Sequence, residues 1–318
     1  MSASKFFSRF SWGVLVYNLL VILWGAYVRA TGSGAGCGSR WPLCNGEVIP
    51  RTPQFGTIIE FVHRISSGLS LFLVIILFFW AFRLFPKGNP VRFGAVLCLI
   101  FILTEAIVGA GLVLFEWVAN DVSNGRVISM AVHLINTFLL LGSLTMTSWW
   151  AAGGARLKLR GQGVILWLFV FGFLGVILLG VSGAITALGD TLFPATTLSE
   201  GFSQDFNPAA HLLIRLRVWH PVIAVFLGFY LLFLSGLVAL FRVTRTIRIF
   251  AALLAGFFII QLGAGLVNLF LLAPVWMQLV HLFLADLVWI TLVLLAMTNF
   301  SISEISQNVE SSRSWNPA

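Results

Sequence analysis

Four of the five histidines occupy matching places in two parts of the chain. His63 and His220 are 157 residues apart, and His133 and His281 are 148 apart, and all four fall within long apolar runs. One intramembrane histidine is as often a satisfied hydrogen-bonding residue as a ligand, but four at equivalent positions need a common cause. Because neutral imidazole is a frequent metal ligand, the spacing indicates two sites, each built from two histidines.

The number of histidines at each site decides between metals. Two imidazoles that face one another across a helix bundle at the same depth suit axial ligation of a haem iron. Zinc or copper sites add further thiolate, imidazole or carboxylate ligands, whereas each part of this chain offers two histidines in register. We therefore expect a bis-histidine haem site in each half. His211 has no counterpart, and we expect it to be an ordinary residue at the membrane interface.

A charged position next to the histidines differs between the two parts. Glu60 stands three residues before His63, one helical turn away on the same face, and the equivalent position holds Arg217. A guanidinium suits the anionic propionates of a permanently held haem, and a carboxylate suits proton transfer or stabilisation of developing positive charge. The alternative is that Glu60 only forms an ion pair with Arg64 or Arg29.

Two cysteines form a second difference between the parts. Cys37 and Cys44 are separated by six residues, and the equivalent later segment has no cysteine. On the outer side of a membrane they meet an oxidising compartment, where a disulfide can form. It would either staple the loop or cycle between thiol and disulfide beside the first site, and the spacing slightly favours the staple. Cys98, inside an apolar run, is expected to be a small buried residue.

Other charged residues near the histidines indicate less specific roles. Glu105 and Asp286 are intramembrane acids whose counterparts in the repeat described below are Ile259 and Phe138, so they are expected to join polar networks or a proton path. Several arginines should bind propionates, or else cap the membrane interface. These are Arg29, Arg64, Arg215 and Arg217.

The elements that position these residues must be membrane helices. Of 318 residues, 59% are hydrophobic and 9% are charged, against about 25% charged in a soluble domain. Uncharged runs long enough to cross a bilayer recur along the chain, and they predict an all-α polytopic membrane protein. The net charge of +8 does not indicate nucleic acid, because the basic residues lie between apolar runs. The eight predicted spans are 12–30, 57–82, 93–115, 127–150, 164–186, 211–241, 249–272 and 277–299, with Ala273-Pro274 as the break before the last.

The distribution of basic residues predicts the orientation. With the N-terminus inside, 12 of the 19 lysines and arginines fall on the cytoplasmic side and six on the other, so both termini are expected to be cytoplasmic. Both long connections, 31–56 and 187–210, are then external.

The sequence also contains an internal repeat. Residues 109–113 (Gly-Ala-Gly-Leu-Val) recur as residues 263–267, and the histidine pairs keep the same order. Two units of four helices each enter the membrane in the same direction, so they are parallel repeats, which disfavours an inverted-repeat transporter. We expect two pseudo-twofold-related four-helix bundles. The predicted divisions are 1–155, 156–300 and a disordered cytoplasmic tail, 301–318.

On these residues the chain resembles haem A synthase, the membrane enzyme that oxidises haem O on the way to cytochrome oxidase. The resemblance covers nearly the whole chain and is closest to bacterial members with one cysteine pair in the first external loop. Its most specific parts are Glu60-Phe61-Val62-His63-Arg64, Gly32-Ser33-Gly34 through Cys37, Trp41-Pro42-Leu43-Cys44, His220-Pro221, and Val280-His281-Leu282 followed by Ala285-Asp286.

The resemblance implies an oxidoreductase that converts the C8 methyl of haem O, by successive hydroxylations, to a gem-diol that loses water to give a formyl group. It implies haem O in the N-terminal bundle and a haem b cofactor in the C-terminal one. Glu60 matches the essential acid, which would stabilise a cationic carbon at C8 or deprotonate the attacking water. The implied haem O ligands are His63 and His133, the implied haem b ligands are His220 and His281, the further cofactor-binding candidates are Arg217 and Arg64, and the additional catalytic candidates are Cys37 and Cys44, as a disulfide.

The resemblance also implies a setting. The expected partners are haem O synthase, cytochrome oxidase and its assembly, and membrane lipid, with a homo-oligomer also compatible. The expected location is the bacterial cytoplasmic membrane. A second cysteine pair, which some members carry in the third external loop, is absent here. A mechanism that exchanges two disulfides is therefore disfavoured, and the electron acceptor is left open.

Two other functions compete with this interpretation. A dihaem b-type electron-transfer protein or quinol oxidoreductase normally holds its haems near opposite membrane faces, whereas all four histidines here are predicted near one face. A transporter or haem exporter would explain the spans, but not why Glu60 and the cysteine pair occur in one half only.

Overall fold

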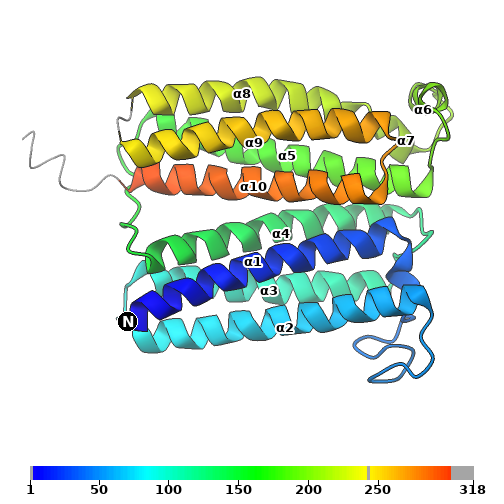
Figure 1. Cartoon of the computed structure of the whole chain (residues 1–318), viewed down its shortest axis with the longest axis horizontal. Helices are drawn as coiled ribbons and strands as arrows, with labels where there is room; N and C mark the ends of the chain where they lie inside the picture. The colour runs from blue at the N-terminus through cyan, green and yellow to red at the C-terminus, as the bar shows by residue number, and fades with distance from the viewer. Residues whose placement is uncertain (1–2, 242–243, 302–318) are drawn as a thin grey trace, which may run out of the picture.

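The computed structural model describes residues 3–241 and 244–301 of the chain (Figure 1). Within these ranges the regular elements are helical, and eight spans are long and apolar enough to cross a membrane. The prediction of an all-α protein with eight spans is confirmed. The predicted disordered tail lies, from residue 302 onward, outside the described residues.

The first four spans form one half of the molecule, and the last four form the other (Figure 1). The first half consists of α1 (Ala3–Ala30), α2 (Phe55–Leu84), α3 (Pro90–Leu114) and α4 (Asn124–Ala151). The second consists of α5 (Val164–Leu192), α7 (Leu212–Leu216) with α8 (Trp219–Phe241) as one span, α9 (Arg245–Phe270) and α10 (Val275–Phe300). Two short elements, η1 (Ser33–Ala35) and α6 (Leu198–Asp205), lie in the long connections.

Polar caps explain where several spans begin. The side chains of Asn89, Ser123 and Thr244 each accept a hydrogen bond from a backbone N–H in the first turn of α3, α4 and α9. Such a cap contributes about 1 kcal/mol. The predicted break before the last span is confirmed, because Ala273 has a φ of 52° and Pro274 precedes α10.

Some helices are longer than the predicted spans because they continue beyond the apolar stretch. α1 begins at Ala3 rather than residue 12, and α5 continues to Leu192 rather than 186. Hydropathy marks the part of a helix that needs lipid, whereas the backbone hydrogen bonds continue into the interface, where long side chains such as Lys5 reach water. The structure also adds α6 in the second external connection and divides the sixth span near Arg217.

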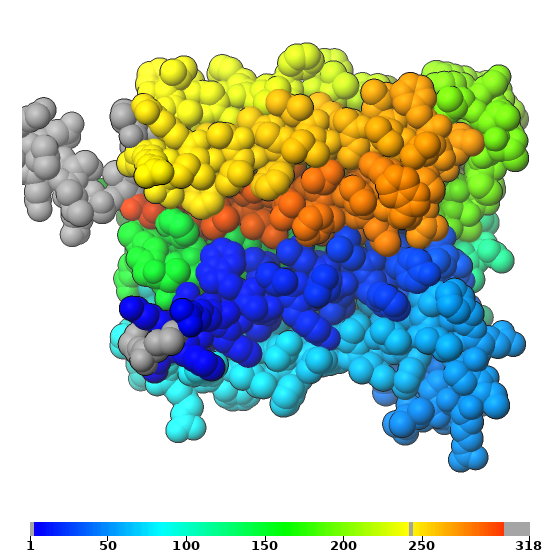
Figure 2. Space-filling view, viewed as in Figure 1, coloured from blue at the N-terminus to red at the C-terminus, as the bar shows by residue number. Residues whose placement is uncertain are grey.

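The two halves meet along α4 and α10, with α1 and α5 completing the contact. The indole Nε1 of Trp289 donates to the Phe138 carbonyl at 2.6 Å, and the two rings stack with centroids 4.9 Å apart. Gly142 faces the same indole, where a Cβ would lie 3.4 Å from Trp289 Nε1. Figure 2 shows the halves joined into one body, with the loop after α1 projecting beyond it.

Candidate functional site

The second half brings its two predicted histidines close together. The ring centroids of His220 and His281 are 6.2 Å apart, and the ring planes are inclined at 82°. An imidazole nitrogen binds a transition metal at about 2 Å, so two axial imidazoles on one metal have centroids roughly 6 Å apart. Nδ1 of His281 is buried without a hydrogen-bond partner. This pair therefore has the centroid spacing that two axial ligands of an iron porphyrin would have.

Each of the four histidines packs against a glycine on the preceding span. A Cβ at Gly25, Gly183 or Gly265 would lie 2.9–3.0 Å from Cε1 of the facing ring, and one at Gly109 would lie 3.9 Å away. Carbon atoms in contact normally sit about 3.5–4.0 Å apart, so a side chain at the first three positions would displace the imidazole. The four glycine and histidine pairs are Gly25 with His63, Gly109 with His133, Gly183 with His220, and Gly265 with His281.

We expect Gly183→Ala to weaken haem retention in the second half at least several-fold. The new methyl group would displace the His220 ring from the position that gives the pair its spacing. The absorbance of bound haem after detergent purification measures the effect. Gly236→Ala on α8, where the Cβ meets nothing within 4 Å, is the matched control. Equal haem content in the two variants would contradict this role for Gly183.

In the first half, His63 lies on α2 and His133 on α4, and each ring faces a glycine of the preceding span. Nδ1 of both rings is buried without a hydrogen bond, but the two environments differ. Oε1 of Glu105 lies 3.4 Å from Nδ1 of His133. Glu105 also accepts hydrogen bonds from Asn136 Nδ2 at 2.5 Å and Thr137 Oγ1 at 2.6 Å. Glu105 therefore joins a polar network around one predicted ligand, as expected from its position in the membrane.

The structure corrects the repeat partner of Glu105. The match of residues 109–113 with residues 263–267 pairs Glu105 with Ile259, but Ile259 is 56% exposed. The residue that contacts the histidine of the next span is Gln261, whose Nε2 lies 3.2 Å from His281 Nε2. Aligning the repeat on its small apolar residues therefore placed the counterpart of Glu105 two positions away from Gln261, which the histidine contacts identify.

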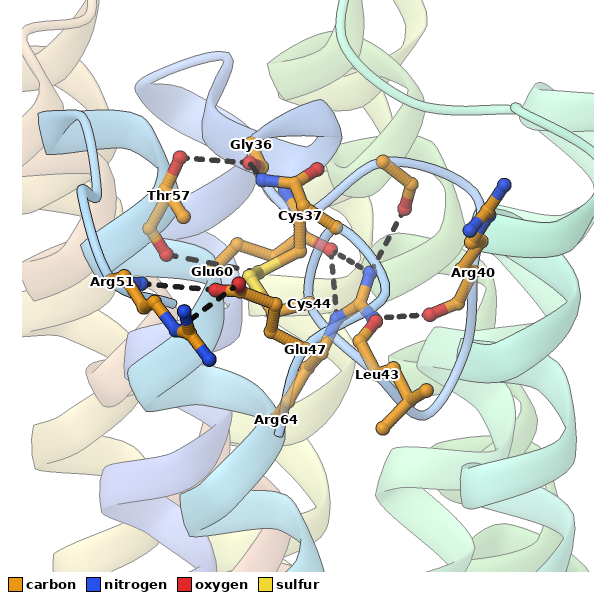
Figure 3. Close-up of a disulfide and its surroundings, with 12 residues drawn as sticks. Gly36, Cys37, Arg40, Leu43, Cys44, Glu47, Arg51, Thr57, Glu60 and Arg64 are labelled. Carbon is orange, nitrogen blue, oxygen red and sulfur yellow. Dashed lines mark hydrogen bonds and ion pairs between the residues drawn. A yellow bond between two sulfur atoms is a disulfide. The ribbon is translucent and has the colours of Figure 1, made fainter. Parts of the chain in front are cut away.

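Glu60 joins α2 to the external cysteine loop (Figure 3). Its side chain is buried, at 3% exposure. Oε2 accepts the Cys37 backbone N–H at 2.7 Å, and Oε1 accepts from Arg64 Nε at 3.0 Å and Nη2 at 2.5 Å. Arg64 in turn donates to the carbonyls of Leu43 at 2.6 Å and Gly38 at 3.1 Å. The ion pair that the sequence left as an alternative is present, and it holds the loop over the start of α2.

The cysteine loop is closed by the predicted Cys37–Cys44 disulfide, with an S–S distance of 2.02 Å. Both cysteines are buried, and Thr57 Oγ1 adds a hydrogen bond of 2.8 Å to the Gly36 carbonyl. Cys37 thus links the disulfide directly to Glu60. The loop, the disulfide and the carboxylate form one connected structure at the external end of the first half.

Two predicted arginines are held by acids and carbonyls at the same end of the second half. Arg217 pairs with Asp190 and Asp205, each at 2.9 Å. Partial burial raises the pKa of the Asp205 carboxyl, and Arg217 opposes that shift. Acidification should therefore weaken the Arg217–Asp205 pair at a higher pH than it would for a fully exposed aspartate in the same pair.

Arg29 does not contact Glu60. It reaches from α1 to the second half and donates to Gln278 Oε1 at 2.8 Å.

The structure also places the other residues that were named from the sequence, which are His211, Cys98 and Asp286. His211 Nδ1 accepts the Leu213 N–H and caps α7. Cys98 is buried, with its sulfur 3.4 Å from Thr147 Oγ1. Asp286 is fully buried, and neither carboxyl oxygen has a hydrogen bond within the described part of the chain. Within residues 3–241 and 244–301, no three His, Cys, Asp or Glu side chains form a metal-binding group.

Comparison with known proteins identifies the family. Residues 8–293 match the COX15-CtaA family, described as "Cytochrome oxidase assembly protein". The chain belongs to this family.

Individual relatives match shorter regions of this chain than the family as a whole does. A protein of Thermus thermophilus named protoheme IX farnesyltransferase is 54% identical over 259 residues, which cover 81% of the chain and 43% of that protein. A heme A synthase from Halalkalibacterium halodurans is 47% identical over 97 residues, covering 30% of the chain and 33% of the relative. A heme A synthase from an Exiguobacterium species (strain AT1b) is 39% identical over 140 residues, covering 42% and 45%. The matches thus span less than half the length of these relatives.

Three features of this COX15-CtaA family member were missed by sequence reasoning. The glycines beside His63 and His281 carried a signal, because small residues in membrane helices mark close approach. Gln261 was hidden by the misleading repeat match. The reach of Arg29 into the other half had no local signal, because its acceptors lie more than 150 residues away.

Proposed function

We propose that the chain is a haem A synthase, an oxidoreductase that converts the C8 methyl of haem O to a formyl group. The observation that carries this proposal is an asymmetry between the two halves. Both halves hold a histidine pair, but only the first has a buried carboxylate one turn from a histidine, Glu60. Family membership and relatives named heme A synthase support the same function.

In this proposal each histidine pair binds a different haem. His63 and His133 would hold substrate haem O, and His220 and His281 would hold haem b. Haem b, when bound, supplies a one-electron redox centre beside the substrate pocket. The second pair supports the assignment through its 6.2 Å centroid spacing and its glycine contacts.

Arg217 and Arg64 are the arginines that we propose near the haem propionates. Arg217 already carries two carboxylate partners, and Arg64 carries Glu60 and loop carbonyls. Each arginine would bind a propionate while it keeps these partners, which already balance part of the guanidinium charge.

Glu60 is the residue that we propose touches the reacting carbon. Each hydroxylation replaces one methyl C–H bond with a C–OH group from water and releases two protons and two electrons, which an external electron acceptor would take up; loss of water from the gem-diol leaves the formyl group. A carboxylate could stabilise positive charge on the carbon or take the proton of the attacking water. It offers about four lone-pair positions, of which Cys37 and Arg64 occupy three. Both carboxylate oxygens are therefore already bound, and the substrate would meet a carboxylate held in a fixed position.

The cellular setting follows from the same proposal. We place the chain in the bacterial cytoplasmic membrane with both termini in the cytoplasm, in accord with the basic excess on that side. Haem O synthase would supply the substrate, and cytochrome oxidase would receive the product. The Thermus relative supports the first partner, since it is named as a protoheme IX farnesyltransferase and more than half of its length lies outside the match.

Pigment extraction provides the direct test. The full chain is expressed in cells that make haem O but lack a haem A synthase, and extracted haems are separated by chromatography. We expect haem A to appear and haem O to fall. Haem O unchanged, with protohaem showing a reversible redox transition in the purified protein, would instead support the dihaem electron-transfer alternative.

A further inference from the structure

The two halves place different groups beside the histidine of their last span. In the first half, Glu105 on α3 lies 3.4 Å from a ring nitrogen of His133 on α4. In the second, Gln261 on α9 lies 3.2 Å from a ring nitrogen of His281 on α10. Glutamate and glutamine have nearly the same shape and differ in charge. The comparison is therefore between two similar contacts, one of them to an acid.

Glycine contacts confirm that these two positions correspond. Gly109 packs on His133 and Gly265 packs on His281, and each follows the contacting Glu or Gln by four residues. Four residues make about one helical turn, so the side chain and the glycine lie on the same face of the helix. Glu105 and Gln261 thus occupy corresponding helix positions beside the histidine, although Glu105 lies against Nδ1 of His133 and Gln261 against Nε2 of His281.

The surroundings of Glu105 suit an acceptor. Thr137 donates its hydroxyl, and Asn136 donates its amide nitrogen. The orientation of Asn136 is set by Thr104, whose hydroxyl donates to Asn136 Oδ1 at 2.6 Å, and by the Phe101 carbonyl, which accepts from Nδ2 at 2.8 Å. Because an ionised carboxylate only accepts, this arrangement matches a carboxylate that also faces an imidazole N–H.

The surroundings of Gln261 suit a neutral partner. Its Oε1 and the Nδ1 of His281 are both buried without hydrogen bonds. Gln261 faces Nε2 of His281, and its carboxamide is neutral in either orientation, whereas His133 faces a carboxylate.

We propose that Glu105 is a positioning residue that gives His133 an anionic partner and so lowers the reduction potential of the haem in the first pocket relative to that in the second. The proposal rests on the proposed function only in taking both histidine pairs as haem ligands. A carboxylate that accepts from the far nitrogen of a ligating histidine makes the bound nitrogen more basic, which stabilises ferric over ferrous iron. The Gln261 amide lacks this charge.

Reciprocal exchange of the two side chains tests the proposal. Protohaem is bound to the full chain with one pocket at a time disabled, the second by His220→Ala with His281→Ala, and the first by His63→Ala with His133→Ala. Spectroelectrochemical titration then measures each midpoint potential. We expect Glu105→Gln to raise the ratio of ferrous to ferric haem in the first pocket at least tenfold at fixed potential, about 59 mV for one electron. Gln261→Glu should lower the ratio in the second pocket.

Each outcome decides the proposal. Glu105→Asp, which keeps the charge, should stay closer to the parent potential than Glu105→Gln, which a purely structural role would not produce. If Glu105→Gln does not fold, the shift in Gln261→Glu decides alone. Unchanged potentials, or no protohaem in either pocket, would overturn the inference. A chain that shows both shifts but forms no haem A keeps this inference and loses the proposed function.

Discussion

Replacing Glu60 by glutamine is expected to lower haem A formation by about 100-fold or more, while the chain still folds and binds haem. The amide keeps an oxygen that can accept the Cys37 N–H, and it removes the charge that the proposed chemistry needs. Losing one partner of a buried ion pair costs about 3–5 kcal/mol when the other charge is left alone. Arg64 keeps its loop carbonyls, so we expect a smaller loss of stability, about 1 kcal/mol.

Glu47→Gln is the matched control for this experiment. Glu47 lies in the same loop and pairs with Arg51 at 3.6 Å, but both side chains are exposed. Such a pair contributes about 0–1 kcal/mol, so this variant should make haem A normally. Haem A is quantified by chromatography of extracted pigments, alongside the haem content of the purified protein. A normal yield from Glu60→Gln would remove the acid from the mechanism.

Replacing His220 or His281 by alanine is expected to remove the proposed haem b from the purified chain. Each change deletes one of two imidazoles whose spacing matches axial ligation. His63→Ala should instead leave that haem in place and chiefly impair turnover, because His63 lies in the other half. Haem content per chain and the absorbance spectrum of the reduced protein distinguish these results.

Two comparisons separate ligand loss from misfolding. His211→Ala deletes a helix cap, worth about 1 kcal/mol, and should retain haem. Free imidazole added to His281→Ala should fill the vacated space beside Gly265 and restore haem binding in part. Full haem content in both His220→Ala and His281→Ala would show that these residues are not the ligands.

Much of the architecture could be predicted from hydropathy and spacing. Eight spans follow from long uncharged runs, because lipid imposes one simple requirement on every residue of a span. The break at Pro274 has an equally local cause. The exact ends of α1 and the short helix α6 could not be predicted, since they depend on caps and packing outside the apolar layer.

The candidate site was predictable in composition but less so in its contacts. Repeat spacing identified the histidine pairs and the asymmetry at Glu60, because those residues recur at readable intervals. Spacing placed Glu60 on the face of His63, but its binding to Cys37 depends on how a distant loop folds back. Repeated letters also misplaced the counterpart of Glu105, because a run of Gly, Ala, Leu and Val is shared by many lipid-facing surfaces.

The reach of Arg29 limits how the molecule can move. Its guanidinium donates to the Ala187 carbonyl, Thr191 Oγ1 and Gln278 Oε1, at 2.7–2.9 Å, across the joint between the halves. Trp289 makes a second cross-tie farther along the same joint. Rocking the halves apart, as an alternating-access carrier must, would break four hydrogen bonds, each contributing about 1 kcal/mol. The halves should therefore keep a constant separation, as electron exchange between the two proposed haems would require.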